Sequence, residues 1–465
     1  MSDHFRVAFI SGKLGDVDGV SLEVDKWIEI LSELGHEVYA IAGTFTGPLE
    51  HVPQERTLEL PKIRFDSPDQ REFEQLVFPY LAKRPRQLSS QQLKEVVEHM
   101  EALGIEVAHQ LFEYIRERSI DVLIAENTNA MPMTLLGGIA VHQLATEMRV
   151  ATIFHHHDFW WERSRFSDTR IRNLLNRIMP PVDPGLEHVV ISSYAAHILS
   201  SLKRVSPFVI PNCEHFEAAV ECDDYNATLR EELGFSQHDV LVIQPTRIVP
   251  RKRIEDSIRF LAAFARKYPE YGDRLRFVIS LYQGDEPDDT YIDSIRSLAE
   301  QESIPFYLIS DRVAARRGSD GDGRRLFTNR DVLVNADLVT YLPIWEGFGN
   351  ALLEAIAARV PIVTTTYLVY KTDIKGTGLQ NVEIRDRYDE AGRLIIPDDA
   401  LEATKQLLED RTRARELTDR NFAIAKQEFG FSVLKQKIVG LLSSYGDEIR
   451  ASRQRVTKSK YYYSV

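Results

Sequence analysis

The chain has 465 residues, 43% of them hydrophobic, and a formal net charge of -13. This length exceeds what one hydrophobic core usually organises, so two domains of roughly 200 residues each are expected. The charge argues against a nucleic-acid partner, whose backbone requires clustered Lys and Arg, and the apolar runs are shorter than the roughly 20 residues of a membrane-spanning helix.

The first half alternates short apolar runs with helical patterns, which is typical of a parallel sheet covered on both faces. The run at 6–11, a glycine-bearing loop and an amphipathic stretch at 20–34 form the opening of a βαβ unit. Further strands are expected at 37–42, 122–125, 150–154 and 188–191. We therefore predict a Rossmann-like domain over residues 1–205.

One segment of this domain departs from the alternating pattern. Residues 62–102 are charged, helix-prone and interrupted by three prolines, so we predict a helical insertion, either a lid over an acceptor or a plain surface insertion.

The amino terminus lacks the basic region, long apolar stretch and cleavage site of a secretory signal. We expect a cytoplasmic protein without stable membrane insertion.

A second series of apolar runs restarts the same rhythm. It begins at 208–212 and continues at 240–244, 276–281, 306–309, 338–342 and 361–364. Pro207 and Pro211, which cannot extend a helix, lie where the chain would cross between domains. We predict a second Rossmann-like domain over 206–432, facing the first across a cleft, and a segment 433–465 whose helix returns to the first domain. Cys213 and Cys222 have no metal-ligand spacing, which fits a reducing compartment.

The segment from Glu346 to Glu354, Glu-Gly-Phe-Gly-Asn-Ala-Leu-Leu-Glu, follows the strand at 338–342 and opens a helix. Gly347 and Gly349 allow the backbone to approach a ligand, and the free amides from Phe348 through Ala351, which include Asn350, point out of the positive end of the helix. This pattern predicts an anion site flanked by two carboxylates.

Upstream, the strand at 240–244 runs into a basic loop that contains Arg247 and Lys252. Arg247 can bind an anion as a bidentate fork and Lys252 as a point charge. We interpret the loop as the phosphate-binding partner of the glycine-rich segment.

These two segments resemble the signature of glycosyltransferase family 4, Glu-x7-Glu with Gly-Phe-Gly inside it, and the family element Gly-Arg-x4-Lys-Gly. The resemblance implies that Glu346 binds hydroxyls of the donor sugar, that Glu354 binds the ribose of the nucleotide, and that the fold is the GT-B fold. Thr246 and Arg253 stand where the family usually has Gly, which indicates a locally different loop.

In the first domain, His155, His156 and His157 follow the strand at 150–154, and sites in open α/β sheets lie at that edge. The family has a functional histidine there, near the donor sugar, and the sequence leaves open which of the three it is. Three consecutive residues on a strand alternate in direction and cannot all converge on one ion, so we expect no metal here.

Further residues of the first domain are candidates for substrate contact. Gly19 resembles the amino-terminal glycine motif of the family, although Asp18 replaces the usual first Gly. An acceptor-binding wall is suggested by the residues that follow the histidines, with aromatic core packing as the alternative. Its candidate members are Asp158, Trp161, Glu162 and Arg163.

The resemblance implies a retaining glycosyltransferase that moves a hexosyl group from a nucleotide-diphosphate sugar to an acceptor hydroxyl on a small sugar, sugar phosphate, polyol or glycan. Catalysis is assigned to Glu346, Arg247, Lys252 and the histidines, and no metal or cofactor is expected. The alternatives are a nucleotide-sugar epimerase of the same fold, a pyridoxal-phosphate-dependent phosphorylase and a non-catalytic nucleotide-sugar binding protein.

Overall fold

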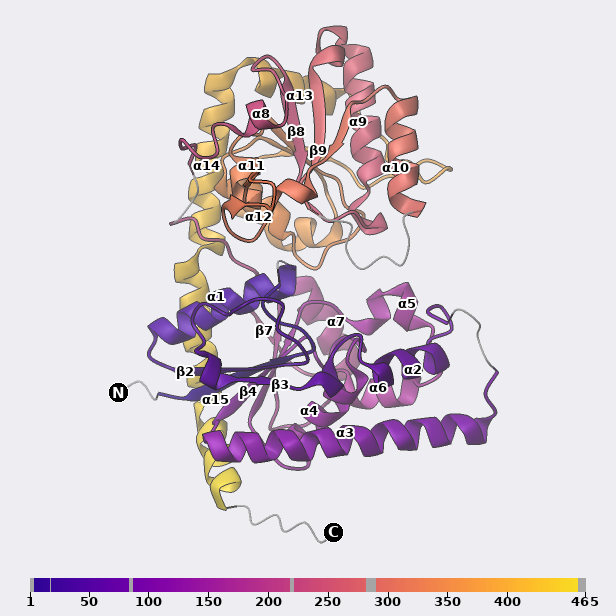
Figure 1. The fold of residues 1–465 in the computed structure, drawn as a ribbon, viewed down its shortest axis with the longest axis vertical. Coiled ribbons are helices and arrows are strands. Elements are labelled where there is room, and N and C mark those ends of the chain that lie inside the picture. The colour runs from indigo at the N-terminus through magenta and orange to yellow at the C-terminus, as the bar shows by residue number, and fades with distance from the viewer. Residues whose placement is uncertain (1–3, 17, 83–86, 218–220, 282–289, 459–465) are drawn as a thin grey trace. The chain divides into compact units, whose positions relative to one another are not determined.

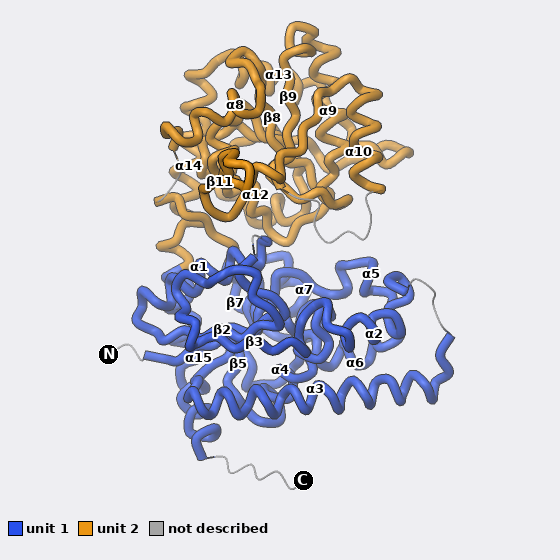
Figure 2. Tube along the Cα trace, viewed as in Figure 1, with its two compact units in different colours: residues 1–210, 435–465 blue, residues 211–434 orange. Residues whose placement is uncertain are grey.

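The computed structural model describes residues 4–16, 18–82, 87–217, 221–281 and 290–458. The chain forms two compact units, shown in two colours in Figure 2. Unit 1 contains residues 1–210 and 435–465, and unit 2 contains residues 211–434. Each unit is built around its own parallel sheet (Figure 1), so the predicted pair of Rossmann-like α/β domains is confirmed.

The sheet of unit 1 has seven strands in the order β3-β2-β1-β4-β5-β6-β7. Every neighbouring pair is parallel. Its central strands are apolar and buried, as expected of strands covered on both faces. The strands are β1 (Arg6–Ser11), β2 (Glu37–Ala42), β3 (Thr57–Glu59), β4 (Val122–Glu126), β5 (Thr152–His156), β6 (Glu187–Val190) and β7 (Phe208–Val209).

Helices of unit 1 begin and end at recognisable residues. Asp18 caps α1 by accepting hydrogen bonds from Val20 and Ser21, and Ser89 forms a capping box with Gln92 at the start of α3. In Figure 1, α3 runs along α4 on one side of the unit. The helices are α1 (Gly19–Glu33), α2 (Pro68–Val77), α3 (Ser90–Arg118), α4 (Leu135–Thr146), α5 (Ser164–Ser167), α6 (Arg172–Ile178) and α7 (Ser193–Lys203). The predicted insertion at 62–102 thus contains α2 and the first part of α3.

Unit 2 has a parallel six-stranded sheet in the order β10-β9-β8-β13-β14-β15. Its strands are β8 (Val240–Gln244), β9 (Leu275–Ile279), β10 (Phe306–Leu308), β13 (Leu338–Tyr341), β14 (Ile362–Thr365) and β15 (Val382–Ile384). A separate hairpin pairs β11 (Gly318–Ser319) with β12 (Arg325–Leu326). The helices are α8 (Leu229–Glu232), α9 (Ile254–Lys267), α10 (Thr290–Gln301), α11 (Asn329–Leu333), α12 (Asn350–Ala357), α13 (Asp398–Glu409) and α14 (Arg411–Phe429).

The last helix, α15 (Phe431–Lys458), packs against the first sheet. Tyr445 donates a hydrogen bond to the carbonyl of Gly185, Ser452 accepts one from the amide of Ala151, and Arg453 pairs with the buried Asp121. The carboxyl-terminal segment is therefore part of unit 1.

One expectation from the sequence was wrong. The apolar run at 208–212 was predicted to open the second domain, but β7 pairs in parallel with β6 at the edge of the first sheet. Its two residues complete an existing sheet edge, a role that a local apolar pattern does not distinguish from the start of a new sheet. Unit 2 begins at Pro211.

Candidate functional site

The donor-site residues predicted from the sequence lie on two neighbouring loops of unit 2. β8 and β13 are adjacent strands, so the loops that follow them meet at the carboxyl edge of the sheet. The amide of Ile344 donates to the carbonyl of Arg251 at 3.1 Å and joins the two loops. Gln244 supports the first loop by donating to the carbonyl of Lys252 and accepting from Ser257.

Glu346 is the centre of this arrangement. Its side chain is 8% exposed and forms ion pairs with Lys252 and, at 2.7 Å, with Arg251. Burial alone would raise the pKa of Glu346, but the two cations outweigh burial and lower it to about 2. Burial lowers the pKa of Lys252 to about 8 despite the attraction of Glu346. The charged carboxylate thus has two cationic partners, and Arg251 is one that the sequence motif did not assign.

Arg247, the other cation predicted from the sequence, lies on the same loop and is half-buried. Its positive charge acts on Lys252 and contributes to the lowered pKa of that lysine. One carboxylate and three cationic side chains leave the cluster with a net positive charge, which suits a diphosphate.

The glycine-rich turn directly precedes α12. Gly349 has a φ of 131°, and a Cβ atom at this position would lie 2.3 Å from the hydroxyl of Tyr367. That hydroxyl donates to the carbonyl of Phe348 at 2.7 Å. Only glycine fits this turn, which directs the first amides of α12 toward the sheet edge.

Asn350 and Glu354, the remaining donor-site candidates, are both half-buried on α12. Asn350 accepts a hydrogen bond from Asn212 at 2.7 Å. Glu354 accepts one at 2.6 Å from Asn329, which in turn accepts from Ser280. The structure therefore brings all donor-site candidates of unit 2 to one edge of its sheet.

In unit 1, Gly19 is the first residue of α1, beside the capping Asp18. Asp18 also pairs with Lys13 at 3.3 Å. The turn is therefore held by a side-chain cap and an ion pair, and the Asp that replaces the usual first Gly has a structural role here.

The three histidines have different environments. His155 bonds through Nδ1 to Glu126 at 3.0 Å and packs against Trp27. His156 points to the other side, where its Nε2 lies 3.0 Å from Nδ1 of His188, and burial lowers its pKa well below the usual value. Both residues are 1% exposed, so they belong to the core.

His157 is the most exposed of the three, at 8%. Its backbone amide donates to Asn127, and its Nε2 lies 2.5 Å from Glu126 Oε1. It is therefore the histidine best placed to contact a ligand. Glu126 was missed by the sequence reasoning, although its position as the only charged residue of the buried strand β4 is a signal that could have found it.

Glu126, His155 and His157 offer possible metal-ligand atoms within 4.8 Å of one another. His156 points away from this group, and the convergence of His155 and His157 on one carboxylate was not anticipated from the sequence. The separations of 3.0 and 2.5 Å between oxygen and nitrogen are hydrogen-bond distances. In this structure Glu126 is joined to both histidines by direct hydrogen bonds.

The candidate acceptor wall forms a compact polar and aromatic cluster. Asp158 forms an ion pair with Arg163, and both side chains are 20% exposed. Burial and the charge of Asp158 raise the pKa of Glu162 to about 7, while its carboxylate accepts from the amide of Phe159. Trp161 stacks on Phe159 with ring centroids 4.6 Å apart. Trp161 is half-buried and takes part in aromatic packing, and all four residues remain candidates for acceptor contact.

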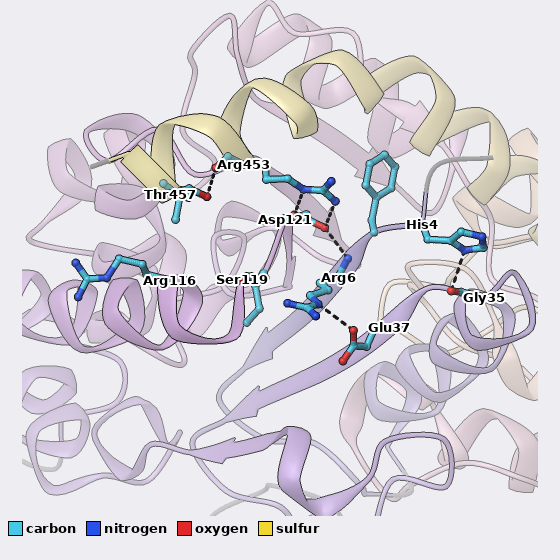
Figure 3. A pocket seen from close by; sticks show the side chains of 12 residues that line it. His4, Arg6, Gly35, Glu37, Arg116, Ser119, Asp121, Arg453 and Thr457 are labelled. Carbon is cyan, nitrogen blue, oxygen red and sulfur yellow. Dashed lines mark hydrogen bonds and ion pairs between the residues drawn. The ribbon is translucent and has the colours of Figure 1, made fainter. Parts of the chain in front are cut away.

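A cavity of about 440 Å³ lies at the opposite, amino-terminal edge of the first sheet (Figure 3). Four of its charged lining residues form two ion pairs, Arg6 with Glu37 at 2.9 Å and Arg453 with Asp121. These contacts hold the sheet edge and α15 together. The cavity is thus separate from the candidate site, since the histidines lie at the carboxyl edge.

Comparison with known proteins identifies the family. Residues 226–420 match the family described as glycosyl transferases group 1. The mannosylglucosylglycerate synthase of Thermotoga maritima is 31% identical over 446 residues, which cover 92% of this chain and 98% of that protein. The chain belongs to the group 1 glycosyl transferases. The enzyme of the same name from Petrotoga mobilis is 29% identical over 82% of this chain and 86% of that protein.

The fold agrees with this assignment. This group 1 glycosyl transferase resembles Anabaena HepE, solved in complex with UDP and glucose, with a TM-score of 0.60 and 16% identity over 95% of this chain and 100% of that one. The GT-B fold is thereby confirmed. The chain is a glycosyltransferase that moves a sugar from a nucleotide sugar to an acceptor. Among its described helices, none has the length and apolar character needed to cross a membrane.

Proposed function

We propose that this chain transfers a hexosyl group, with retention of anomeric configuration, from a nucleoside-diphosphate sugar to a hydroxyl of a small carboxylate-bearing acceptor of the glucosylglycerate type. The acceptor class is supported by the names of the two synthases, whose product joins mannosyl, glucosyl and glycerate groups. The similarity to the Thermotoga maritima enzyme extends over both domains, because it covers 98% of that protein.

The observation that carries the mechanism is the position of Glu346 between Arg251 and Lys252. Lys252 and Arg247 neutralise the diphosphate as it leaves, assisted by the amides at the start of α12. Glu346 holds hydroxyls of the donor sugar and stabilises positive charge at its anomeric carbon. An oxygen of the leaving diphosphate accepts the proton of the incoming hydroxyl, so no separate base is needed and the configuration is retained.

We further propose that transfer needs no divalent metal. In many phosphate-transferring sites a metal neutralises the developing charge, and here three cationic side chains of one loop can do so. Transfer should therefore continue at an unchanged rate after dialysis against EDTA. Loss of activity that returns on addition of Mg²⁺ or Mn²⁺ would contradict this part of the proposal.

The substrates can be tested by incubating the purified chain with UDP-glucose or GDP-mannose, each with and without glucosylglycerate. We expect a new glycoside only when donor and acceptor are both present, with the same anomeric configuration as the donor by NMR. Epimerised nucleotide sugar without acceptor would indicate the epimerase alternative. Donor binding without any turnover would indicate a binding protein, and an inverted product would refute the retaining mechanism.

A further inference from the structure

We propose that Glu126 is a positioning residue that holds His157 as an imidazolium, whose second ring N–H donates a hydrogen bond to an oxygen of the bound substrates. The contact with substrate rests on the proposed function, whereas the charge state of the pair does not. This assigns a role to a buried carboxylate that neither the sequence motifs nor the donor site includes.

The pair is built by two adjacent strands. Glu126 is the last residue of β4 and lies opposite His155 of β5 in the sheet register. The side chain of Glu126 is fully buried, and its two oxygens contact His155 Nδ1 and His157 Nε2 separately. Within the described part of the chain, Glu126 forms no ion pair with Arg or Lys. A buried carboxylate requires compensation of its charge, so a histidine must supply it.

The surroundings decide which histidine carries the extra proton. The Nε2 atom of His155 is buried without a hydrogen-bond partner, so a proton there would become an unpaired donor in the core. His157 can be protonated at Nδ1, which bonds to none of the described residues, and its ring is the more exposed of the two. The geometry therefore assigns the extra proton to His157.

The charges that face His157 agree with this assignment. Glu23 of α1, itself paired with Lys26 at 2.6 Å, and Asp158 of the following loop act on His157 together with Glu126. Burial alone would lower the pKa of His157, but these carboxylates raise it above the usual value. Burial alone would likewise raise the pKa of Glu126, and the two histidines lower it to about 2.

A donor at this position suits substrates rich in hydroxyl and anionic oxygens. Because Nε2 is committed to Glu126, the protonated ring presents only Nδ1–H, and loss of the proton would convert this atom from a donor into an acceptor. Transfer should therefore decline as the pH rises through the raised pKa of His157. Glu126 sets the pH of this decline through the pKa of His157, without touching the substrate.

The experiment compares the wild type with Glu126→Gln, which keeps the size and hydrogen-bonding capacity of the side chain but removes its charge. The pKa of His157 is measured by NMR titration of the ring carbons, with His157→Asn used to assign the resonance. We expect a pKa above 6.5 in the wild type and a fall of about 1 pH unit or more in Glu126→Gln. The alkaline limb of the transfer rate should shift to lower pH by the same amount. Glu37→Gln, at the amino-terminal edge of the same sheet, is the matched control and should change neither.

A wild-type His157 that is neutral at pH 6.5 would overturn the proposal, and this titration needs no variant. An unshifted alkaline limb in Glu126→Gln, despite a lowered pKa, would refute the contact with substrate. Stoichiometric zinc in the wild type that is lost in Glu126→Gln would identify the group as a metal site instead. If no transfer occurs with any donor, the proposed function fails, while the titration still decides the charge of the pair.

Discussion

Glu346→Gln removes the negative charge between Arg251 and Lys252 while keeping the shape of the side chain. A pKa lowered from 4.5 to about 2 corresponds to about 3 kcal/mol in favour of the charged form in the folded state. The variant loses this stabilisation but recovers part of it. Lys252, with a pKa of about 8 even beside Glu346, would lose its proton near neutral pH once the carboxylate is gone. We therefore expect the free energy of unfolding of Glu346→Gln at pH 7 to be about 2 kcal/mol lower than that of the wild type.

The assay is a thermal melt of both proteins with and without nucleoside diphosphate, followed by the transfer rate. For a unit of this size, the melting temperature of the variant should fall by about 4–8 °C. Nucleoside diphosphate should raise the melting temperature of the variant again in part, because it binds the cationic side chains that Glu346 no longer pairs with. Transfer should fall on the order of 100-fold or more. The depressed pKa stabilises the wild type above pH 4.5, and this contribution is lost as the pH falls toward 2. The difference in melting temperature between the wild type and Glu346→Gln should therefore become smaller at acid pH. A wild-type transfer rate in Glu346→Gln would remove the residue from the mechanism.

Three other changes test the donor site. Arg247→Ala should weaken nucleoside-diphosphate binding about 10-fold or more, with only partial rescue in Arg247→Lys because the fork geometry is lost; equal affinities in calorimetry would contradict the phosphate role. Glu354→Ala should raise the Michaelis constant for the donor more than it lowers turnover, about 10-fold for a lost charged hydrogen bond, and an unchanged donor affinity would refute the ribose contact. Gly349→Ala should destabilise the protein by about 1–3 kcal/mol because of its positive φ and the nearby Tyr367 hydroxyl. Gly440→Ala, in open space on α15, is its control and should stabilise slightly in denaturant unfolding.

Much of the fold could be predicted from local pattern. The strands at 6–11, 37–42 and 240–244 have the bounds expected from their apolar runs, because each is buried on both faces and flanked by loop residues. Short edge strands such as β3 and β15 have three residues each and were not predicted. Each pairs with the strand that precedes it in the chain, but three residues are too short a run to show the apolar pattern of a strand.

The sequence by itself determined the family and the donor-site motifs, because Glu346, Glu354, Arg247 and Lys252 stand at fixed spacings around strand ends. These spacings are local, so adjacency of residues in the chain is enough to place them.

Only the tertiary structure decided which groups pair with them. Arg251 reaches Glu346 because β8 and β13, almost a hundred residues apart, are neighbours in one sheet. Likewise, β4 beside β5 places Glu126 between His155 and His157 and sends His156 to the other side. The charge state of a buried carboxylate or imidazole depends on partners brought together by strand order, which the sequence does not state.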